Sequence, residues 1–321
     1  MTDEKILITG TAGMVGSHLL EYYSGKVKRE NMIGTYHNPT IRLADILDLC
    51  VPVELDVRHA EAFEKVIHEF RPSKIFHLAA QSFPTVSWLK PVETMDINAN
   101  GTINLFEAIL SLRKIDSTYN PVVVVACSSA EYGASLTPEN VPVKETADLL
   151  PLHPYGVSKV AQDLLTYQYF MSHGIRGIRA RIFNTTGARK TNDAVSDFIF
   201  RANEIVAGRE KTFRAGNLES RRAITDVRDL VKALVLLSEK GTAGDVYNIS
   251  GEKVYRMSEV VALIEKISRT KFQIETDKNL LRPTDEPIIY GDSTKLKTAT
   301  GWKQEFSLED TIRNMFEYLK R

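Results

Sequence analysis

Cysteine, net charge and long apolar runs are all scarce in this sequence. The chain of 321 residues has only two cysteines, Cys50 and Cys127, too few and too far apart for a zinc or disulfide framework. Its 41 acidic residues balance 41 basic ones, so the charge gives no reason to expect nucleic acid or an anionic membrane as a partner. No apolar run approaches the roughly 18 residues of a membrane-spanning helix.

Metal ligands and targeting signals are also missing from the pattern. The seven histidines show no paired ligand spacing, so we expect no metal site. The first residues, MTDEKILITG, are polar and acidic and lack the apolar core of a signal peptide. Unpaired cysteines suit a reducing compartment. We therefore expect a cytoplasmic protein.

Apolar strands alternate with helical patterns through the first half of the chain. The strands are unbroken apolar runs and not alternating ones, which is typical of a parallel sheet covered by helices on both faces. The predicted strands are Lys5–Thr9, Met32–His37, Val51–Val57, Lys74–Ala80, Pro121–Ser129 and Gly177–Phe183. This pattern predicts an α/β fold with a doubly wound parallel (Rossmann) sheet.

The second half loses this rhythm. Its segments are shorter and more polar, although Asp245–Ser250 has the composition of a strand that returns to the sheet. We expect a dinucleotide-binding domain formed by residues 1–183 and about 223–250. Residues 184–222 and 251–321 would then form a smaller C-terminal α/β lobe that binds substrate.

A glycine pattern, TGTAGMVGS, follows the first strand and opens the first helix. Gly10, Gly13 and Gly16 lack side chains, so a pyrophosphate could approach backbone N–H groups at the positive helix end, with Met14 and Val15 in the same loop. A glycine-rich turn without a ligand is the alternative. The position between strand and helix favours a dinucleotide site.

The end of the second strand bears on the choice of cofactor. An acidic residue there would bind the ribose hydroxyls of NAD, but the segment TYHNPTIR has none. His37 and Arg42 could instead attract a 2′-phosphate, so we favour NADP(H) and leave NAD(H) open. Asp56, followed by Val57, could bind an adenine amino group or could cap the next helix.

Tyr155 and Lys159, in PYGVSK, are four residues apart at the start of a predicted helix and so share one face. A phenol titrates near 10, and an adjacent ammonium and an oxidised nicotinamide should lower that pKa so that the hydroxyl can exchange a proton. Ser128, at the carboxyl end of the fifth strand, could hydrogen-bond the same substrate oxygen. A surface tyrosine beside a surface lysine is the alternative. A second such pair, Tyr22 and Lys26, lies where its helix ends, and we reject it.

The segments TGTAGMVGS, HLAAQ, NANGT, CSSAEYG, YGVSK and RIFNTTG together resemble the extended short-chain dehydrogenase/reductase family. The resemblance implies a catalytic trio of Ser128, Tyr155 and Lys159, and it places Leu78, Ala79 and Ala80 beside the cofactor. It also implies a homodimer packed through the helices that contain Asn98–Leu110 and Tyr155–Phe170.

The second half resembles the GDP-sugar branch of that family, which comprises GDP-mannose 4,6-dehydratases and GDP-4-keto-6-deoxy-mannose reductases. The matching stretches are FRAGNLESRRAITDVRDLVKAL and LLRPTDEPIIYGDSTKLKTATGW. The resemblance implies that Arg222 and Arg282 clamp the substrate diphosphate and that Asp285 binds its ribose. It also implies four further residues that line the pocket: Asn184, Arg189, Gln81 and Ser129. From the residues alone, the charged ones could equally be solvated loop charges.

One departure separates the two enzymes of this branch. The dehydratases carry Thr-Ser-Glu-x-Tyr-Gly, and aligned on Tyr-Gly this chain has Ala130 in place of that Glu, with Glu131 one residue later. In an extended segment Glu131 would point the opposite way. Loss of water needs an acid/base group at that place, whereas simple reduction does not.

We therefore expect NAD(P)H-dependent reduction of the C4 ketone of GDP-4-keto-6-deoxy-D-mannose to GDP-D-rhamnose. The face of C4 that receives hydride stays undetermined. An NAD-dependent nucleotide-sugar epimerase or dehydratase is one alternative, and a non-catalytic NADP-sensing regulator is a more remote one.

Overall fold

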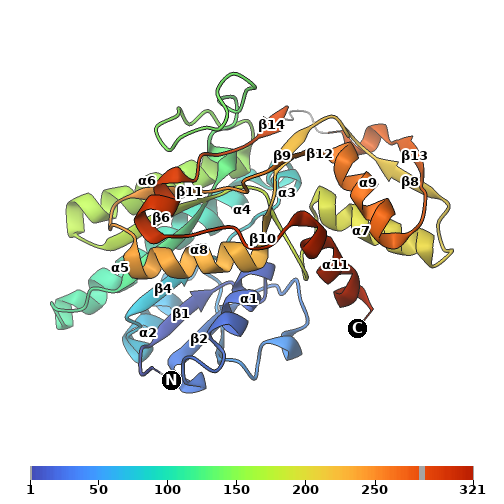
Figure 1. Ribbon diagram of the computed structural model, residues 1–321. Coiled ribbons are helices and arrows are strands. Elements are labelled where there is room, and N and C mark those ends of the chain that lie inside the picture. Colours follow the sequence, from blue (N-terminus) through green and yellow to red (C-terminus); the bar gives the residue numbers. More distant parts are fainter. Residues whose placement is uncertain (1, 282–285, 321) are drawn as a thin grey trace.

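The computed structural model describes residues 2–281 and 286–320 of the chain. Its centre is a seven-stranded sheet in the order β11-β6-β5-β4-β1-β2-β3, in which every neighbouring pair is parallel (Figure 1). The strands are β1 (Ile6–Thr9), β2 (Met32–Tyr36), β3 (Val51–Glu54), β4 (Lys74–His77), β5 (Val122–Ser128), β6 (Arg176–Ile182) and β11 (Val246–Ile249). The predicted parallel sheet is confirmed, and β11 is the returning strand.

Helices cover both faces of this sheet. One face carries α1 (Met14–Tyr23), α8 (Val227–Lys240) and α10 (Thr294–Thr300), and the other carries α2 (Ala60–Phe70), α5 (Gly101–Ile115) and α6 (Pro154–His173). Alternate residues of β1 serve the two faces: Ile6 and Ile8 pack with Leu19 of α1, while Leu7 packs with Phe63 of α2. Every residue of β1 is buried, which explains its unbroken apolar sequence.

The strand order reverses direction between β1 and β4. The chain runs from β1 outward to β2 and β3, and then crosses to β4 on the other side of β1. In open α/β sheets, ligands bind outside the carboxyl ends of the strands at such a switch point. The topology therefore places a site over the ends of β1, β4 and β5.

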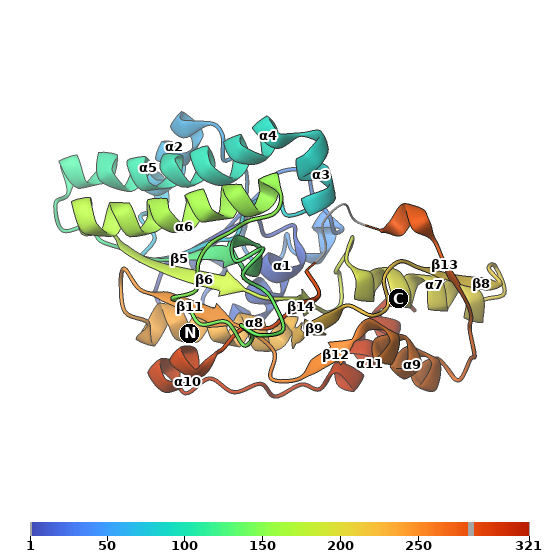
Figure 2. The ribbon, with the colours of Figure 1, turned by 90° about the horizontal axis from the view of Figure 1, so that it is seen from above.

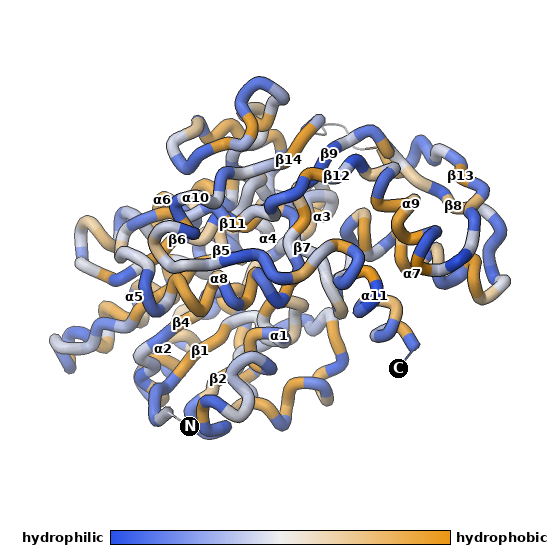
Figure 3. Tube along the Cα trace, in the orientation of Figure 1, coloured by the Kyte–Doolittle hydropathy of each residue, from blue (hydrophilic) through white to orange (hydrophobic). Residues whose placement is uncertain are grey.

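A C-terminal lobe with its own apolar core lies beside the sheet (Figures 1 and 2). Its core joins Phe213 to Val260 and Ile312, and in Figure 3 apolar residues gather on α7 and α9, which contact each other. Its elements are α7 (Ala194–Val206), β8 (Thr212–Ala215), β9 (Arg221–Ala223), β12 (Val254–Arg256), α9 (Met257–Ser268), β13 (Gln273–Thr276), β14 (Ile288–Ile289) and α11 (Leu308–Leu319).

Four short elements connect these two parts or lie beside the site. They are α3 (Pro84–Leu89), α4 (Pro91–Met95), β7 (Thr185–Thr186) and β10 (Thr225–Asp226). The sequence pattern did not reveal α3 and α4, because two prolines interrupt the helical spacing; each proline instead occupies a first helical turn. Within the described residues, no helix is both long and apolar enough to cross a bilayer.

Candidate active site

A cavity of about 670 Å³ opens at the carboxyl ends of β1, β4 and β5, a size typical of small-molecule sites. Its walls come from the loop after β1, the ends of β2 to β6, the start of α6, and segments of the lobe. Of the predicted cofactor residues, those that line it are Gly10, Gly13, Met14, Val15, Gly16, His37, Asp56, Val57, Leu78, Ala79, Ala80, Tyr155 and Lys159. The fold thus brings almost the whole predicted set to one place.

The glycine loop is packed too closely for side chains. Gly10 has φ +74°, and a Cβ there would lie 2.9 Å from the backbone nitrogen of Ala79. A Cβ on Gly16 would lie 2.4 Å from the carbonyl oxygen of Gly10. Helix α1 begins with Gly13 at its N-cap and no side chain caps it, so the first turn can present N–H groups to an anion. These features fit the pyrophosphate of a dinucleotide.

The adenosine end of the predicted cofactor site is built around Asp56. Its carboxylate accepts hydrogen bonds from the Arg58 guanidinium at 2.6 and 3.0 Å, and His37 Nε2 lies 3.5 Å away. The hydrogen bond from Arg58 is the main reason that the pKa of Asp56 is lowered to about 2. The alternative that Asp56 caps the next helix is wrong, because α2 begins at Ala60 with His59 as its N-cap.

The structure does not bring Arg42 to the cavity. Its largely exposed side chain pairs with Asp45 at 3.2 Å in the surface turn that follows β2. The chain stays at the cavity as far as Thr40, which donates to the Ala12 carbonyl, and only then leaves it. Arg58, which the sequence analysis did not select, supplies the guanidinium that lines the cavity near the end of β3.

Ser128, Tyr155 and Lys159 meet at the centre of the cavity. Ser128 ends β5, and its side chain lies close enough to the Tyr155 phenol to favour the ionised form of the phenol. Helix α6 begins at Pro154, which puts Tyr155 and Lys159 on its first two turns. Lys159 Nζ lies 5.8 Å from the centroid of the Tyr155 ring and donates to the carbonyl of Ala126 at 2.8 Å.

In the protein alone the pKa of Tyr155 is raised, and the lowering expected with an oxidised nicotinamide bound stays a prediction. Burial raises the pKa of Tyr155 to about 12, and the Ser128 side chain opposes this only in part. Burial also lowers the pKa of Lys159 to about 8. For both groups desolvation is the largest cause of the pKa shift, and the Lys159 ammonium donates to Ala126 and Gln162. A protonated phenol is nonetheless the form that can donate a proton.

Ala130 lines the cavity, whereas Glu131 points into the protein interior. Residues Ser129–Glu131 form a 3₁₀ turn, so the extended segment assumed from the sequence is wrong, although the outward and inward orientations are as expected. The Glu131 carboxylate accepts the Ser128 N–H at 2.7 Å. The cavity wall therefore has no carboxylate at position 130, and Glu131 supports the end of β5.

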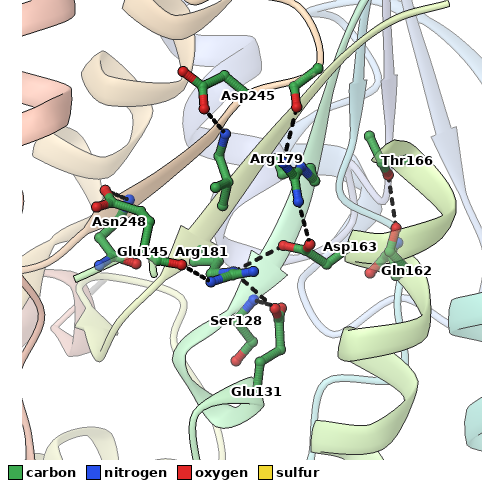
Figure 4. A network of polar contacts seen from close by, with 12 residues as sticks. Ser128, Glu131, Glu145, Gln162, Asp163, Thr166, Arg179, Arg181, Asp245 and Asn248 are labelled. Atoms are coloured by element: carbon green, nitrogen blue, oxygen red, sulfur yellow. Dashed lines mark hydrogen bonds and ion pairs between the residues drawn. The ribbon is translucent and has the colours of Figure 1, made fainter. Parts of the chain in front are cut away.

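Glu131 belongs to a buried network of alternating charges (Figure 4). Arg181 lies between two carboxylates, with Nε 3.1 Å from Glu131 and 2.9 Å from Asp163, and Arg179 pairs with Asp163 at 2.9 Å. Burial, followed by repulsion from Asp163, raises the pKa of Glu131, while Arg181 opposes the shift. The network ties β5 and β6 to α6 beside the predicted trio of Ser128, Tyr155 and Lys159.

Four of the predicted substrate residues also line the cavity: Gln81, Ser129, Asn184 and Arg189. Arg189 pairs with Glu21, but its Nε and Nη1 are buried without a hydrogen-bond partner in the described part of the chain, and so is Asn184 Oδ1. Buried polar atoms normally find partners, so these unpaired atoms are exceptions among the described residues. The Gln81 side-chain amide is instead bonded to Phe83 and Thr94.

Arg222 is not among the residues that line the cavity. It is buried under the lobe, and its guanidinium donates to the carbonyls of Arg221 and Glu286 at 2.9 and 2.8 Å. Backbone carbonyls therefore accept hydrogen bonds from the Arg222 guanidinium, which was expected to bind the diphosphate. Arg282 and Asp285 lie outside the described residues.

His153 is a cavity residue that the sequence analysis missed, because His153 itself was considered only as a possible metal ligand. It is the N-cap of α6, where Nδ1 accepts the Gly156 N–H at 3.0 Å. Its ring stacks on that of Tyr155 with centroids 5.9 Å apart. Its position directly before Pro154 was the available signal, since the residue before a helix-starting proline is a natural N-cap.

Comparison with known proteins agrees with this geometry. Residues 7–315 match the GDP-mannose 4,6 dehydratase family model. The chain is 27% identical to the GDP-6-deoxy-D-mannose reductase of Pseudomonas aeruginosa, over 97% of this chain and 95% of that one. It is 28% identical to GDP-mannose 4,6 dehydratase 2 of Arabidopsis thaliana, over 97% of this chain and 85% of that one.

Solved structures show the same fold. The structure of RMD from Pseudomonas aeruginosa complexed with NADPH matches with a TM-score of 0.84 and 25% identity, covering 98% of each chain. A UDP-glucose 4-epimerase from Thermotoga maritima with UDP-glucose matches with a TM-score of 0.85 and 24% identity, again over 98% of each chain.

Fold and site together define an oxidoreductase of the extended short-chain dehydrogenase/reductase type, with a nicotinamide cofactor. Within that class, the chain belongs to the GDP-mannose 4,6 dehydratase family.

Proposed function

We propose that this enzyme reduces the C4 ketone of GDP-4-keto-6-deoxy-D-mannose to GDP-D-rhamnose with NADPH. The observation that carries the proposal is the wall of the cavity at Ala130. A dehydratase needs an acid/base carboxylate there, and the nearest one, on Glu131, is buried and bound to Arg181 and to the Ser128 N–H. A relative named as a GDP-6-deoxy-D-mannose reductase supports the same choice.

The catalytic residues have separate roles in this reduction. Bound NADPH would supply the hydride for C4. Tyr155, whose pKa burial keeps at about 12, holds its proton at neutral pH and donates it to O4 as negative charge develops there. The Ser128 hydroxyl donates a hydrogen bond to the same oxygen, and the Lys159 ammonium stabilises the phenolate that remains.

Two features favour NADP(H) over NAD(H). The end of β2 has no carboxylate that would repel a 2′-phosphate, and His37 and Arg58 line that part of the cavity. Because Arg58 already neutralises Asp56, the site carries no excess negative charge from that carboxylate. Arg58 thus takes the place that the sequence analysis gave to Arg42. The structure of RMD complexed with NADPH is in line with this choice.

The substrate diphosphate is assigned to the loop after β6. Asn184 and Arg189 line the cavity there, and an arginine can bind a diphosphate with two parallel hydrogen bonds. On the family resemblance we add Arg282 and Asp285 to this proposal.

An absorbance assay tests the proposed reaction. The purified protein should consume NADPH, followed at 340 nm, when given the GDP-linked 4-keto-6-deoxy sugar, and should consume little with GDP-mannose. NADH should be used more slowly, and NMR of the product would identify the C4 epimer. Conversion of a nucleotide sugar without net absorbance change would instead indicate an epimerase or dehydratase. Tight NADPH binding without turnover of any GDP-, UDP- or dTDP-linked 4-keto sugar would contradict the enzymatic proposal.

We also propose that two copies associate through α5 and α6, which lie side by side at the surface (Figure 2). Val157, Leu164 and Met171 on α6 are exposed and are seven residues apart, so they form one apolar stripe along the helix. A second copy that presents the same stripe would bury it in a symmetric interface.

Analytical ultracentrifugation should find a dimer of the wild-type protein and a monomer of Leu164→Glu, because the charge would be buried unpaired. Phe200→Glu is the matched control: Phe200 is an exposed apolar residue on α7, away from the stripe, and its variant should remain dimeric. A wild-type monomer, or a dimer insensitive to the Leu164 change, would contradict this interface.

A further inference from the structure

The catalytic lysine is held by a second residue of its own helix, Gln162. Lys159 Nζ donates to Gln162 Oε1 at 2.7 Å as well as to the Ala126 carbonyl at 2.8 Å. Both side chains are buried, with Lys159 only 3% and Gln162 0% exposed. An ammonium has three donors, so these two bonds fix the direction of the third.

The orientation of the Gln162 amide is itself determined by its neighbours. Lys159 can only donate, so the amide oxygen must face it. The amide nitrogen then donates to Thr102 Oγ1 at 2.8 Å, and the Thr102 hydroxyl donates a hydrogen bond to the Asn98 carbonyl at 2.7 Å. Gln162 therefore cannot rotate away from Lys159 without breaking a buried hydrogen bond.

The hydrogen bonds continue from Thr102 to the cavity on the other side. Thr9 Oγ1 accepts hydrogen bonds from the N–H groups of Leu78 and Ala79, each at 3.0 Å. Because both acceptor positions are then used, the Thr9 hydroxyl donates its own hydrogen bond to His77 Nδ1. His77 Nε2 then donates to Thr102 Oγ1 at 3.2 Å. Burial lowers the pKa of His77 to about 3, which keeps this ring neutral. A neutral chain thus links the lysine to the segment after β4 that lines the cavity.

Among the described residues, the acceptors that contact the Lys159 ammonium carry no charge. Carbonyl and amide oxygens surround Nζ, and the titratable groups that act on it from neighbouring elements are Cys127 on β5 and Glu131 after β5. Neutral His77 on β4 and Tyr155 on α6 complete its titratable surroundings. Glu131 is bound to Arg181. Polar protein groups therefore surround the positive charge of Lys159, but no described carboxylate within hydrogen-bond distance neutralises it.

We propose that Gln162 is a positioning residue for the reaction: its neutral amide holds the Lys159 ammonium beside Tyr155 without neutralising it, so that the positive charge stays available in the cavity when the phenol gives up its proton. The role in turnover rests on the proposed reduction, whereas the effect of Gln162 on the lysine does not.

Titration of the lysine tests this directly. In protein labelled with ¹³Cε-lysine, the Lys159 signal, identified by its loss in Lys159→Met, should titrate with a pKa of about 8. Gln162→Met is nearly isosteric but removes an acceptor from the ammonium, and losing a hydrogen bond to a charged group should lower the pKa by about one unit. Gln162→Glu places a carboxylate there and should raise the pKa. The decline of kcat at alkaline pH should move in the same directions.

Thr166→Val is the control, because Thr166 is buried one turn further along α6 and bonds only the Gln162 backbone carbonyl, at 2.8 Å (Figure 4). It should leave the Lys159 titration unchanged. If Gln162→Met does not fold, Thr102→Val, which frees the amide, should lower the pKa in its place. A Lys159 titration that is the same in wild type and in the Gln162 or Thr102 variants would overturn the proposal, and this result does not depend on whether the protein reduces the proposed sugar.

Discussion

Tyr155→Phe should reduce kcat for the 4-keto sugar by about 10²- to 10⁴-fold, the usual contribution of a positioned general acid. The variant loses the phenolic hydroxyl but keeps the aromatic ring, which stacks on His153. The helix start at Pro154 does not involve the phenol. The loss should therefore appear in turnover, with little change in circular dichroism or in NADPH binding measured by fluorescence.

Tyr22→Phe is the matched control, since Tyr22 and Lys26 form the other tyrosine–lysine pair of the sequence. In the structure Lys26 Nζ lies over the Tyr22 ring, 3.3 Å from its centroid, beyond the end of α1 and outside the residues that line the active-site cavity. This variant should retain wild-type turnover. Near-normal kcat in Tyr155→Phe would show that another group donates the proton.

Arg181→Met should lower the free energy of unfolding by about 3–5 kcal/mol, the effect of removing one partner from a buried ion pair. Arg181 is the shared partner of Glu131 and Asp163, so its removal leaves two carboxylates facing each other in the interior. Its guanidinium also donates to the Tyr132 hydroxyl and the Glu145 carbonyl, each at 3.0 Å. Urea unfolding followed by circular dichroism would measure the loss.

The same substitution at Arg176 is the control, because Arg176 is an exposed residue at the start of the same strand, β6. Arg176→Met should change the free energy of unfolding by less than about 0.5 kcal/mol, as is usual for surface positions. If Arg181→Met were equally mild, then the carboxylates must take up protons readily, and the network would not be what holds the end of β5.

The sequence was most reliable where residues act through their near neighbours in the chain. The glycine loop and the Tyr155–Lys159 pair each lie within a single turn or helix start, so their spacing already determines which atoms share a face. The Ala130 departure was informative for the same reason. Arg42 was misplaced because its position depends on how a loop leaves the sheet, and loop direction is not written in hydrophobic periodicity.

What the sequence by itself determined is the parallel sheet with a glycine loop at its first turn, and it also predicts the catalytic trio, because periodicity and motif spacing are local properties of the chain. Only the tertiary structure decided the pKa values of those residues and which other side chains lie beside them. Burial raises the pKa of Tyr155 where the local pair suggested the reverse, and Arg58, His153 and Gln162 reach the site from separate segments or turns. Desolvation and hydrogen bonding depend on every element packed around a group, so they exist only once the chain has folded.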